Sequence, residues 1–280
     1  MKEITLDKNG YINRAFIYFF LVVTAGVMLL PFMWMLSSSL KLNKDVFSFP
    51  MHWIPENPRW KNYSDIWTKV PLLTFIYNTF KLAIIVTLLQ VLSSSFAAYA
   101  FAKLRFPFRR TLFLGYIATI AVPWQAYMVP QFIMMSRFGL NNTHLSIICL
   151  QAFSAFGVFL MKQFYESVPD ELREAARIDG CSDYTIWLKI MLPLSKPAIS
   201  TLTIITFVNT WNDFLGPQIY LTRTDLKTIQ IGLRAFIGQY SSEYGLIMAA
   251  SVVTVIPVLV VFLALQRYFV QGIASTGIKG

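Results

Sequence analysis

The feature that most constrains this chain is a set of six long runs that contain no Asp, Glu, Lys or Arg. They cover residues 15–40, 82–102, 111–136, 145–161, 197–212 and 245–266. A helix needs about 20 mostly apolar residues to cross a ~30 Å hydrocarbon core. Backbone groups in lipid must be paired internally, so these runs are expected to be helices, and none shows the alternation of a barrel strand. We therefore predict an all-α, polytopic membrane protein.

About six transmembrane helices are expected. They lie at roughly residues 15–38, 78–102, 111–134, 145–163, 197–220 and 245–266, with a polar loop at 164–197. The mean hydropathy of +0.54 and the 56% of hydrophobic residues are outside the range of ordinary soluble proteins. We find no internal repeat and no second domain, so residues 1–280 are treated as a single transmembrane domain.

The net charge of +10 would suit nucleic-acid binding, but the distribution of the basic residues favours membrane orientation instead. With a cytoplasmic N-terminus, fourteen of the 24 Lys and Arg fall in inner segments, most densely in the turn 103–110. Both termini are therefore expected in the cytoplasm, and no nucleic-acid partner is expected. The first run is too long for a signal-peptide core, so it should remain as an anchor. A disulfide between Cys149 and Cys181 is not expected, because their locations and compartment disfavour it.

A polar path through the membrane would need polar or aromatic side chains inside the spans. Pro123 and Pro130 should kink the third span, either as a plain kink or to open a path. For Asn212 and Asp213, capping and path-lining are both open. The candidates for solute contact are Gln90, Tyr99, Trp124, Gln125 and Asn212.

The polar loop has its own helix signals. Ser167 followed by Pro169 and two acids predicts a helix start, and Gly180 is placed to end that helix in a left-handed conformation. Ser182 and Asp183 then begin a second short helix. Pro193 should end the second helix, and Pro197 should open the next span. We predict a rigid helix-turn-helix between two spans.

The first of these two helices has a distinctive surface. Leu172, Ala175, Ala176 and Asp179 recur at helical spacing and form one smooth face, and Glu174 and Arg177 form an i,i+3 pair on its flank. Such an element can seat in the groove of another protein. The alternative is a well-capped loop with no partner.

The order of residues in this loop resembles the EAA loop of binding-protein-dependent ABC importer permeases. The resemblance is carried by Glu174, Ala175, Ala176, Asp179 and Gly180, followed by Ile190, Leu192 and Pro193. Residues 138–144, 211–213 and 266–272 are similar to the sugar branch, which includes the inner-membrane subunits of the maltose transporter. The resemblance covers nearly the whole chain and implies the type I ABC importer permease fold, in a prokaryotic inner or plasma membrane.

The resemblance also implies a set of partners. It predicts a homologous second permease, favouring a heterodimer, two cytoplasmic ATPase subunits, an extracytoplasmic solute-binding protein and a sugar. The coupling residues would be Glu174, Ala175, Ala176, Arg177, Asp179, Gly180 and Pro193. The outer loop 216–244 would face the binding protein, and the tail 272–280 would reach toward the ATPase interface.

The sequence argues against catalysis by this chain. It has no G-x-x-x-x-G-K-[ST] loop, so we expect ATP and Mg to act in a partner ATPase, with no cofactor held here. His52 and His144 lie in no ligand-like cluster, so no metal site is expected and a polytopic membrane enzyme is the weaker alternative. A permease for a phosphate ester or a polyamine is another alternative. The runs contain no acid for a cationic solute, whereas their amides and aromatics favour a sugar.

Overall fold

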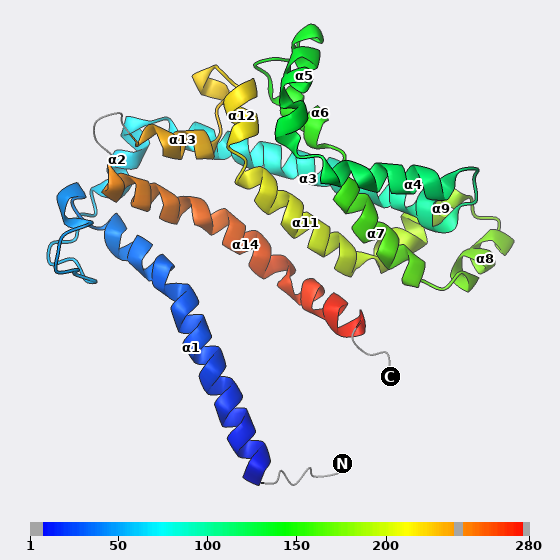
Figure 1. Ribbon diagram of the computed structural model, residues 1–280, viewed down its shortest axis with the longest axis horizontal. Helices are drawn as coiled ribbons and strands as arrows, with labels where there is room; N and C mark the ends of the chain where they lie inside the picture. The colour runs from blue at the N-terminus through cyan, green and yellow to red at the C-terminus, as the bar shows by residue number, and fades with distance from the viewer. Residues whose placement is uncertain (1–7, 238–242, 277–280) are drawn as a thin grey trace. The chain divides into compact units, whose positions relative to one another are not determined.

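The computed structural model describes residues 8–237 and 243–276, and this part of the chain is helical without a strand (Figure 1). In chain order the elements are α1 (Lys8–Ser39), η1 (Asn43–Asp45), α2 (Asn62–Lys69), α3 (Leu72–Lys103), α4 (Arg109–Ala118), η2 (Thr119–Ala121), α5 (Trp124–Arg137), α6 (His144–Gln151), α7 (Ala155–Ser167), α8 (Glu171–Ile178), α9 (Asp183–Ile186), η3 (Trp187–Met191), α10 (Leu192–Leu194), α11 (Lys196–Trp211), α12 (Leu215–Tyr220), η4 (Thr224–Leu226), α13 (Ile229–Ala235) and α14 (Tyr244–Thr276). The predicted all-α class is confirmed.

Three helices are long and apolar enough to cross a membrane: Arg14–Ser39, Leu72–Lys103 and Tyr244–Arg267. Three further candidates are bent pairs. The 109–121 segment, which is α4 with η2, meets α5 at 101°, α6 meets α7 at 40°, and the 183–194 segment meets α11 at 79°. Counting each bent pair as one span gives up to six candidate spans, the number expected from the charge-free runs.

The third predicted span is two helices rather than one straight helix. Val122 has extended backbone angles (φ −85°, ψ 113°), and α5 begins after Pro123. A proline pushes the preceding residue out of the helical region, which accounts for the break at this position. Pro130, in contrast, lies inside α5, where the helix continues.

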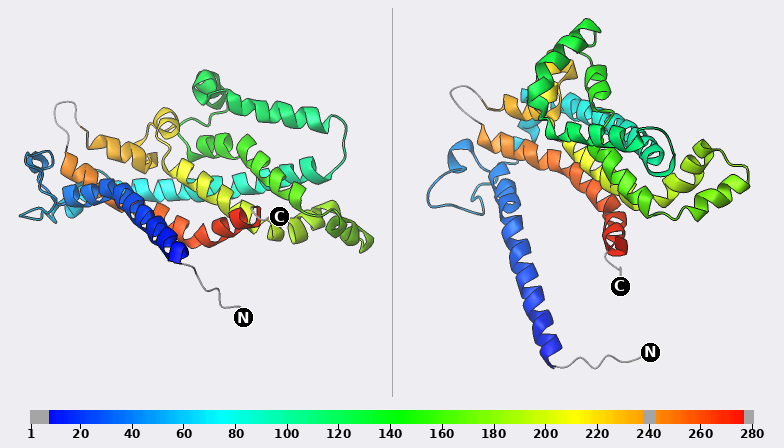
Figure 2. Two further views of the ribbon diagram at one scale, coloured as in Figure 1. Left: turned by 60° about the horizontal axis from the view of Figure 1, so that its bottom comes forward. Right: turned by 45° about the vertical axis from the view of Figure 1, so that its right-hand side comes forward.

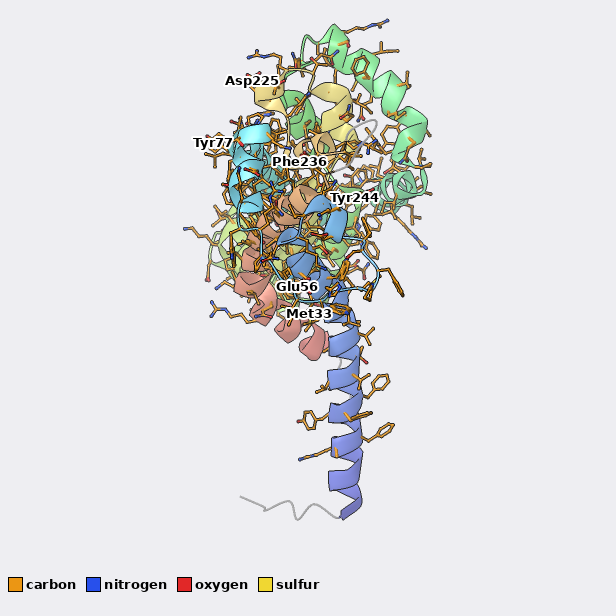
Figure 3. All side chains as sticks on the ribbon, turned by 90° about the vertical axis from the view of Figure 1, so that its left-hand side faces the viewer. Met33, Glu56, Tyr77, Asp225, Phe236 and Tyr244 are labelled. Carbon is orange, nitrogen blue, oxygen red and sulfur yellow. The ribbon has the colours of Figure 1, made fainter. Side chains whose placement is uncertain are left out.

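Contacts divide the chain into two compact units, Met1–Lys69 with Phe236–Val253, and Val70–Ala235 with Thr254–Gly280. In the first unit, the side-chain amide of Asn62 donates to the carbonyls of Ser39 (2.8 Å) and Lys41 (2.9 Å). A Cβ on Gly245 would stand 2.7 Å from the Lys41 carbonyl oxygen, so a glycine is required there. The apolar window of α1 is 0% buried, and its side chains stand away from the ribbon in Figure 3, as expected of a lipid-facing helix.

The second unit is built around α3, which packs against α7 and α11; the three run side by side in Figures 1 and 2. The approach to α7 is close, because a Cβ on Gly157 would stand 2.4 Å from Oγ of Ser94. Ser154 caps the start of α7 by accepting a hydrogen bond from the N–H of Gly157 at 3.0 Å. Small residues thus allow backbones to approach, as is usual between membrane helices.

Candidate functional site

The first candidate site is α8 with the turns on either side of it. Asp170 is its N-cap residue, and Glu171 and Glu174 lie in its first turn, where acids favour the positive end of the helix dipole. The predicted start at Ser167 is wrong. Ser167 is the last residue of α7, and its Oγ donates to the Phe164 carbonyl at 2.7 Å, so it satisfies the end of one helix instead of the beginning of the next.

The end of α8 follows the prediction for Gly180. This glycine has φ +80°, which L side chains rarely adopt. Its N–H donates to the Arg177 carbonyl at 3.0 Å, and the N–H of Cys181 donates to the Ala176 carbonyl at 2.9 Å. These two bonds form a Schellman motif, which satisfies the last carbonyls of the helix and fixes the direction of the exit.

The surface of α8 is mostly exposed. Ala176 is buried at 6% exposure and packs in a core cluster, whereas Leu172, Ala175 and Asp179 are exposed. The predicted smooth face is therefore divided, with Ala176 turned toward the protein. Ile178 is 86% exposed next to the Gly180 turn, so the tip of the segment presents an apolar side chain to its surroundings.

The second short helix of the predicted helix-turn-helix begins as predicted at Ser182, whose Oγ accepts a hydrogen bond from the N–H of Thr185 at 3.3 Å. The helix continues through a π-helical turn, Trp187–Met191, in which the N–H of Leu192 reaches the carbonyl of Trp187. Pro193, which has no N–H to donate, lies in the next turn, α10, so the prediction that it ends the second helix is wrong and the helix continues to Leu194. Ser195 then interrupts the helix, and Pro197 lies in the first turn of α11.

The end of α3 holds the start of α8. The ammonium of Lys103 donates to Oδ1 of Asp170 and to the carbonyl of Val168, both at 2.7 Å, and the guanidinium of Arg173 donates to the Lys103 carbonyl at 2.8 Å. The Lys103 side chain is only 5% exposed. Its hydrogen bond and positive charge lower the pKa of the Asp170 carboxyl below its ordinary value.

A second connection joins α8, α9 and α3 through Asp183. Arg177 donates to both carboxylate oxygens of Asp183, at 3.0 and 2.8 Å, and the Tyr99 hydroxyl donates to Oδ1 at 3.0 Å. Arg177 therefore pairs with Asp183 and not, as predicted, with Glu174, because the turn at Gly180 brings Asp183 back beside α8. Tyr99, a candidate for solute contact, is buried here and tied to α9.

The second candidate site is a cavity of about 680 Å³ within the second unit, with both apolar and polar side chains in its lining. Its lining comes from α3, α5, α6, α7, α11, α12 and the segments that join them. The lining residues are Gln90, Trp124, Tyr127, Gln131, Ile147, Leu150, Gln151, Phe153, Ser154, Phe156, Ile205, Thr206, Asn209, Thr210, Asp213, Gly216 and Tyr220. Its size and its mixture of apolar walls with a few polar groups are typical of small-molecule sites.

Several polar groups in the cavity are bonded to one another. The Gln90 amide donates to the Gln151 carbonyl at 3.0 Å, and its oxygen accepts from the hydroxyl of Thr206. The indole N–H of Trp124 donates to Oε1 of Gln131 at 2.8 Å. These bonds hold the flat Trp124 ring and the Gln90 amide in fixed positions along the wall.

The candidate path residues are only partly brought together. Gln90 and Trp124 line the cavity, whereas Gln125, Tyr99 and Asn212 are not among the residues that line it, and Asn212 accepts a hydrogen bond from Gln230 at 3.1 Å. Several polar lining residues were not among the candidates: Gln131, Gln151, Ser154, Thr206, Asn209 and Thr210. The breaks between helices were the sequence signal that could have indicated these residues, because irregular backbone at membrane depth is tolerated where it lines a cavity.

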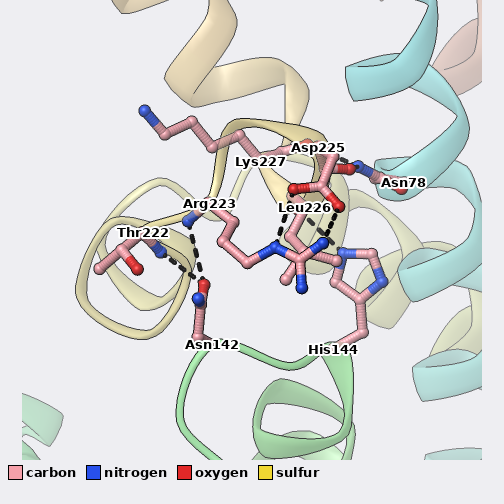
Figure 4. Close-up of polar contacts among 8 residues, drawn as sticks. All are labelled: Asn78, Asn142, His144, Thr222, Arg223, Asp225, Leu226 and Lys227. Atoms are coloured by element: carbon pink, nitrogen blue, oxygen red, sulfur yellow. Dashed lines mark hydrogen bonds and ion pairs between the residues drawn. The ribbon is translucent and has the colours of Figure 1, made fainter.

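The loop after α12 is held by side chains from elsewhere in the second unit (Figure 4). Oδ1 of Asn142 accepts hydrogen bonds from the N–H groups of Thr222 and Arg223, both at 3.0 Å. Asn142 itself has φ 60°, a left-handed conformation that asparagine tolerates better than most residues. The loop backbone is therefore fixed at its start.

The same loop is held again a few residues later. The amide of Asn78 donates to the carbonyls of Asp225 (2.8 Å) and Lys227 (3.0 Å), and Nε2 of His144 donates to the carbonyl of Leu226 at 2.8 Å (Figure 4). The outer loop predicted at 216–244 is thus held by side chains of other elements between residues 222 and 227. Residues 238–242 lie outside the described residues, as do 277–280 of the predicted tail.

Comparison with known proteins gives a consistent result. Residues 90–275 match the family model of the binding-protein-dependent transport system inner membrane component. The chain is 36% identical, over 78% of its length and 79% of the relative, to the arabinooligosaccharides transport system permease protein AraQ of Halalkalibacterium halodurans. It is 32% identical to the lactose transport system permease protein LacG of Rhizobium radiobacter, over 92% of this chain and 94% of the relative.

Another relative is the sn-glycerol-3-phosphate transport system permease protein UgpE of Pectobacterium atrosepticum, 33% identical over 84% of this chain and 86% of the relative. Among solved structures, a bacterial ABC transporter involved in the import of the acidic polysaccharide alginate contains a chain that matches with a TM-score of 0.81. That match has 24% sequence identity and covers 94% of this chain and 99% of the other, so the two chains share a fold.

Proposed function

Since this chain belongs to the family of inner membrane components of binding-protein-dependent transport systems, we propose that it forms half of the translocation path of an ATP-driven sugar importer. Its cargo is a neutral sugar or oligosaccharide delivered by an extracytoplasmic binding protein. The observation that carries this proposal is the cavity, lined by amides, hydroxyls and aromatic rings. A sugar needs such a lining, because its hydroxyls require donors and acceptors and its ring faces are apolar.

The charge of the cavity favours a neutral cargo over the alternatives. Among the described residues that line it, Asp213 alone carries a formal charge. A phosphate ester would meet no lining Lys or Arg there and would be repelled by Asp213. A polyamine would find only this one carboxylate, which already accepts hydrogen bonds from Gln151 and Gly216. The names of the AraQ and LacG relatives, which mention arabinooligosaccharides and lactose, support the same cargo class.

We further propose that α8 docks in a cleft of a cytoplasmic ATPase subunit. Its exposed surface, the apolar Ile178 at its tip and the fixed turn at Gly180 suit a rigid docking element. Two such ATPase subunits, binding ATP and Mg, would serve this chain and a homologous second permease. The chain itself is noncatalytic, and it transmits the closure of the ATPase subunits to the attached spans.

This assignment also sets the orientation. If α8 faces the cytoplasm between the fourth and fifth spans, six spans place both termini on that same side. The loop held by Asn78, Asn142 and His144 then faces outward, where the binding protein docks. The basic residues support this orientation, because fourteen of the 24 lie on the inner side.

The test is reconstitution of the complete complex in proteoliposomes with its binding protein. ATP hydrolysis and uptake are measured with neutral oligosaccharides, with sn-glycerol 3-phosphate and with spermidine. We expect a neutral sugar to raise ATP hydrolysis above the level seen with the unloaded binding protein. A response to the phosphate ester or to the polyamine, with none to any neutral sugar, would contradict the proposal.

A further inference from the structure

Asp213 occupies an unusual place in the cavity. It follows α11 and precedes α12, at one of the breaks that form the cavity wall. A carboxylate in such a setting must be compensated, because burial of an unpaired charge is costly. The sequence alone left two roles open for this residue, capping and path-lining. In the structure its carboxylate accepts a hydrogen bond from the N–H of Gly216 in the first turn of α12, and the residue lines the cavity.

The carboxylate is held in one orientation by two donors. The side-chain amide of Gln151 donates to Oδ2 at 2.8 Å, and the N–H of Gly216 donates to Oδ1 at 3.1 Å. Hydrogen bonds of this kind fix which way the two oxygens of the carboxyl group point. An ionised carboxylate has about four lone-pair positions, so acceptor capacity remains for a group inside the cavity.

Gly216 makes this arrangement possible. A Cβ at this position would stand 2.5 Å from Oδ2 of Asp213, so any side chain would displace the carboxylate. The glycine is not needed for a left-handed backbone, since its φ is not positive. A glycine is therefore needed at position 216 because the Asp213 carboxylate lies so close to it.

Two other amide side chains of the cavity are already engaged. Both ends of the Gln90 amide are bonded within the protein, and Oε1 of Gln131 is taken by Trp124. Asp213 therefore offers the cavity's strongest remaining acceptor. A neighbouring amide, Asn209, is exposed on the same wall.

We propose that Asp213 sets the charge selectivity of this cavity: its carboxylate accepts hydrogen bonds from hydroxyls of a neutral sugar and excludes sugars that carry a carboxylate or phosphate. This inference rests on the proposed function and names the determinant of its cargo class. Sugar hydroxyls are donors that a carboxylate binds well. A second anion in the same partly enclosed space would be repelled, with no lining Lys or Arg among the described residues to offset the repulsion.

The experiment measures ligand binding to the purified complex without the binding protein, so that selection by the binding protein does not enter. Lactose, maltose and arabinobiose are each compared with the corresponding aldonic acid by equilibrium dialysis. In the wild type we expect the neutral sugar to bind and the acid to bind far more weakly. In Asp213→Asn, which retains the shape and an acceptor for the Gly216 N–H, the ratio of the two dissociation constants should fall by roughly tenfold or more.

Two further variants sharpen the result. Glu166→Gln removes the same charge from the far end of α7, where Glu166 pairs with Lys162 on the surface, and it should leave the ratio unchanged. Gly216→Ala keeps the charge but displaces the carboxylate, so it should weaken neutral sugar binding while the complex remains assembled.

The outcomes separate the two proposals. If the wild type binds a neutral sugar and Asp213→Asn leaves the preference against the acid intact, the charge-selectivity role is wrong and the proposed function stands. If the wild type binds none of the neutral sugars and instead binds the acids, both are wrong. Unchanged binding in Gly216→Ala would contradict the need for a held carboxylate.

Discussion

The ammonium of Lys103 donates a 2.7 Å hydrogen bond to the carboxylate of Asp170, joining the last residue of α3 to the N-cap residue of α8. Lys103 also bonds the carbonyl of Val168, and Arg173 returns a bond to the Lys103 carbonyl. On the same α3 helix, Gln90 reaches the cavity wall. One rigid helix thus contacts both candidate sites.

Lys103→Met should uncouple the importer. The change removes both bonds from the buried ammonium and leaves the Val168 carbonyl without this donor, at a cost of about 1 to 2 kcal/mol. We expect basal ATP hydrolysis by the reconstituted complex to persist, and its stimulation by the loaded binding protein to fall. Lys162→Met is the matched control, because Lys162 pairs with Glu166 on α7 and does not hold α8. Equal stimulation in both variants would contradict this role for Lys103.

The stability that the ion pair between Lys103 and Asp170 contributes should decrease at low pH. The pKa of Asp170 is lowered from 3.8, mainly by the hydrogen bond and charge of Lys103. The stabilisation it contributes is therefore present above the ordinary pKa and is lost as pH falls through the lowered pKa. Because the Asp170 side chain is 62% exposed, the stabilisation from this ion pair should be below about 1 kcal/mol.

The measurement is the thermal unfolding midpoint of wild type and Asp170→Asn in detergent. The difference between them should be constant from about pH 8 to about pH 5 and should shrink only at lower pH. A difference that grows as pH falls would have the wrong sign.

Gly180→Val should damage coupling through backbone strain. A β-branched residue at φ +80° costs roughly 1 to 2 kcal/mol, and the Schellman turn that ends α8 would change. Sugar uptake and stimulated ATP hydrolysis should both fall at normal membrane levels. The control is Gly139→Val, since Gly139 has φ +67°, an added Cβ there would meet nothing within 4 Å, and the residue lies outside the 164–197 segment. Survival of both activities in Gly180→Val would rule out the coupling role.

Tyr99→Phe should lower stability without changing the choice of sugar. The variant loses the hydroxyl that donates to Asp183 at 3.0 Å, a contribution of about 0.5 to 1.5 kcal/mol, and it leaves the cavity lining untouched. We expect a lower unfolding midpoint and unchanged sugar dissociation constants. A change in the preference among sugars would instead return Tyr99 to the solute path.

Within the 164–197 segment, residue order predicted the contacts between near neighbours in the chain and did not predict the contacts made after the chain reverses. The Gly180 turn and the Ser182 cap follow from bonds within a few residues, so residue type and order predicted them. The partner of Arg177 was missed because Asp183 comes beside it only after the chain reverses at Gly180. The start of α8 was misplaced because α7 extends through Ser167, which a local cap signal cannot reveal.

The membrane character and the helical class were determined by the sequence itself, because a charge-free run and unpaired backbone in lipid leave few alternatives to a helix. The same holds for the absence of a phosphate-binding loop and for the signals within 164–197. Only the tertiary structure decided which polar residues share a cavity. Gln90, Gln151 and Asp213 lie far apart in the chain and meet because α6 and α11 pack beside α3. The glycine at 157 allows the close approach of Ser94 on α3, and the position of that neighbouring helix is a property of the packed fold.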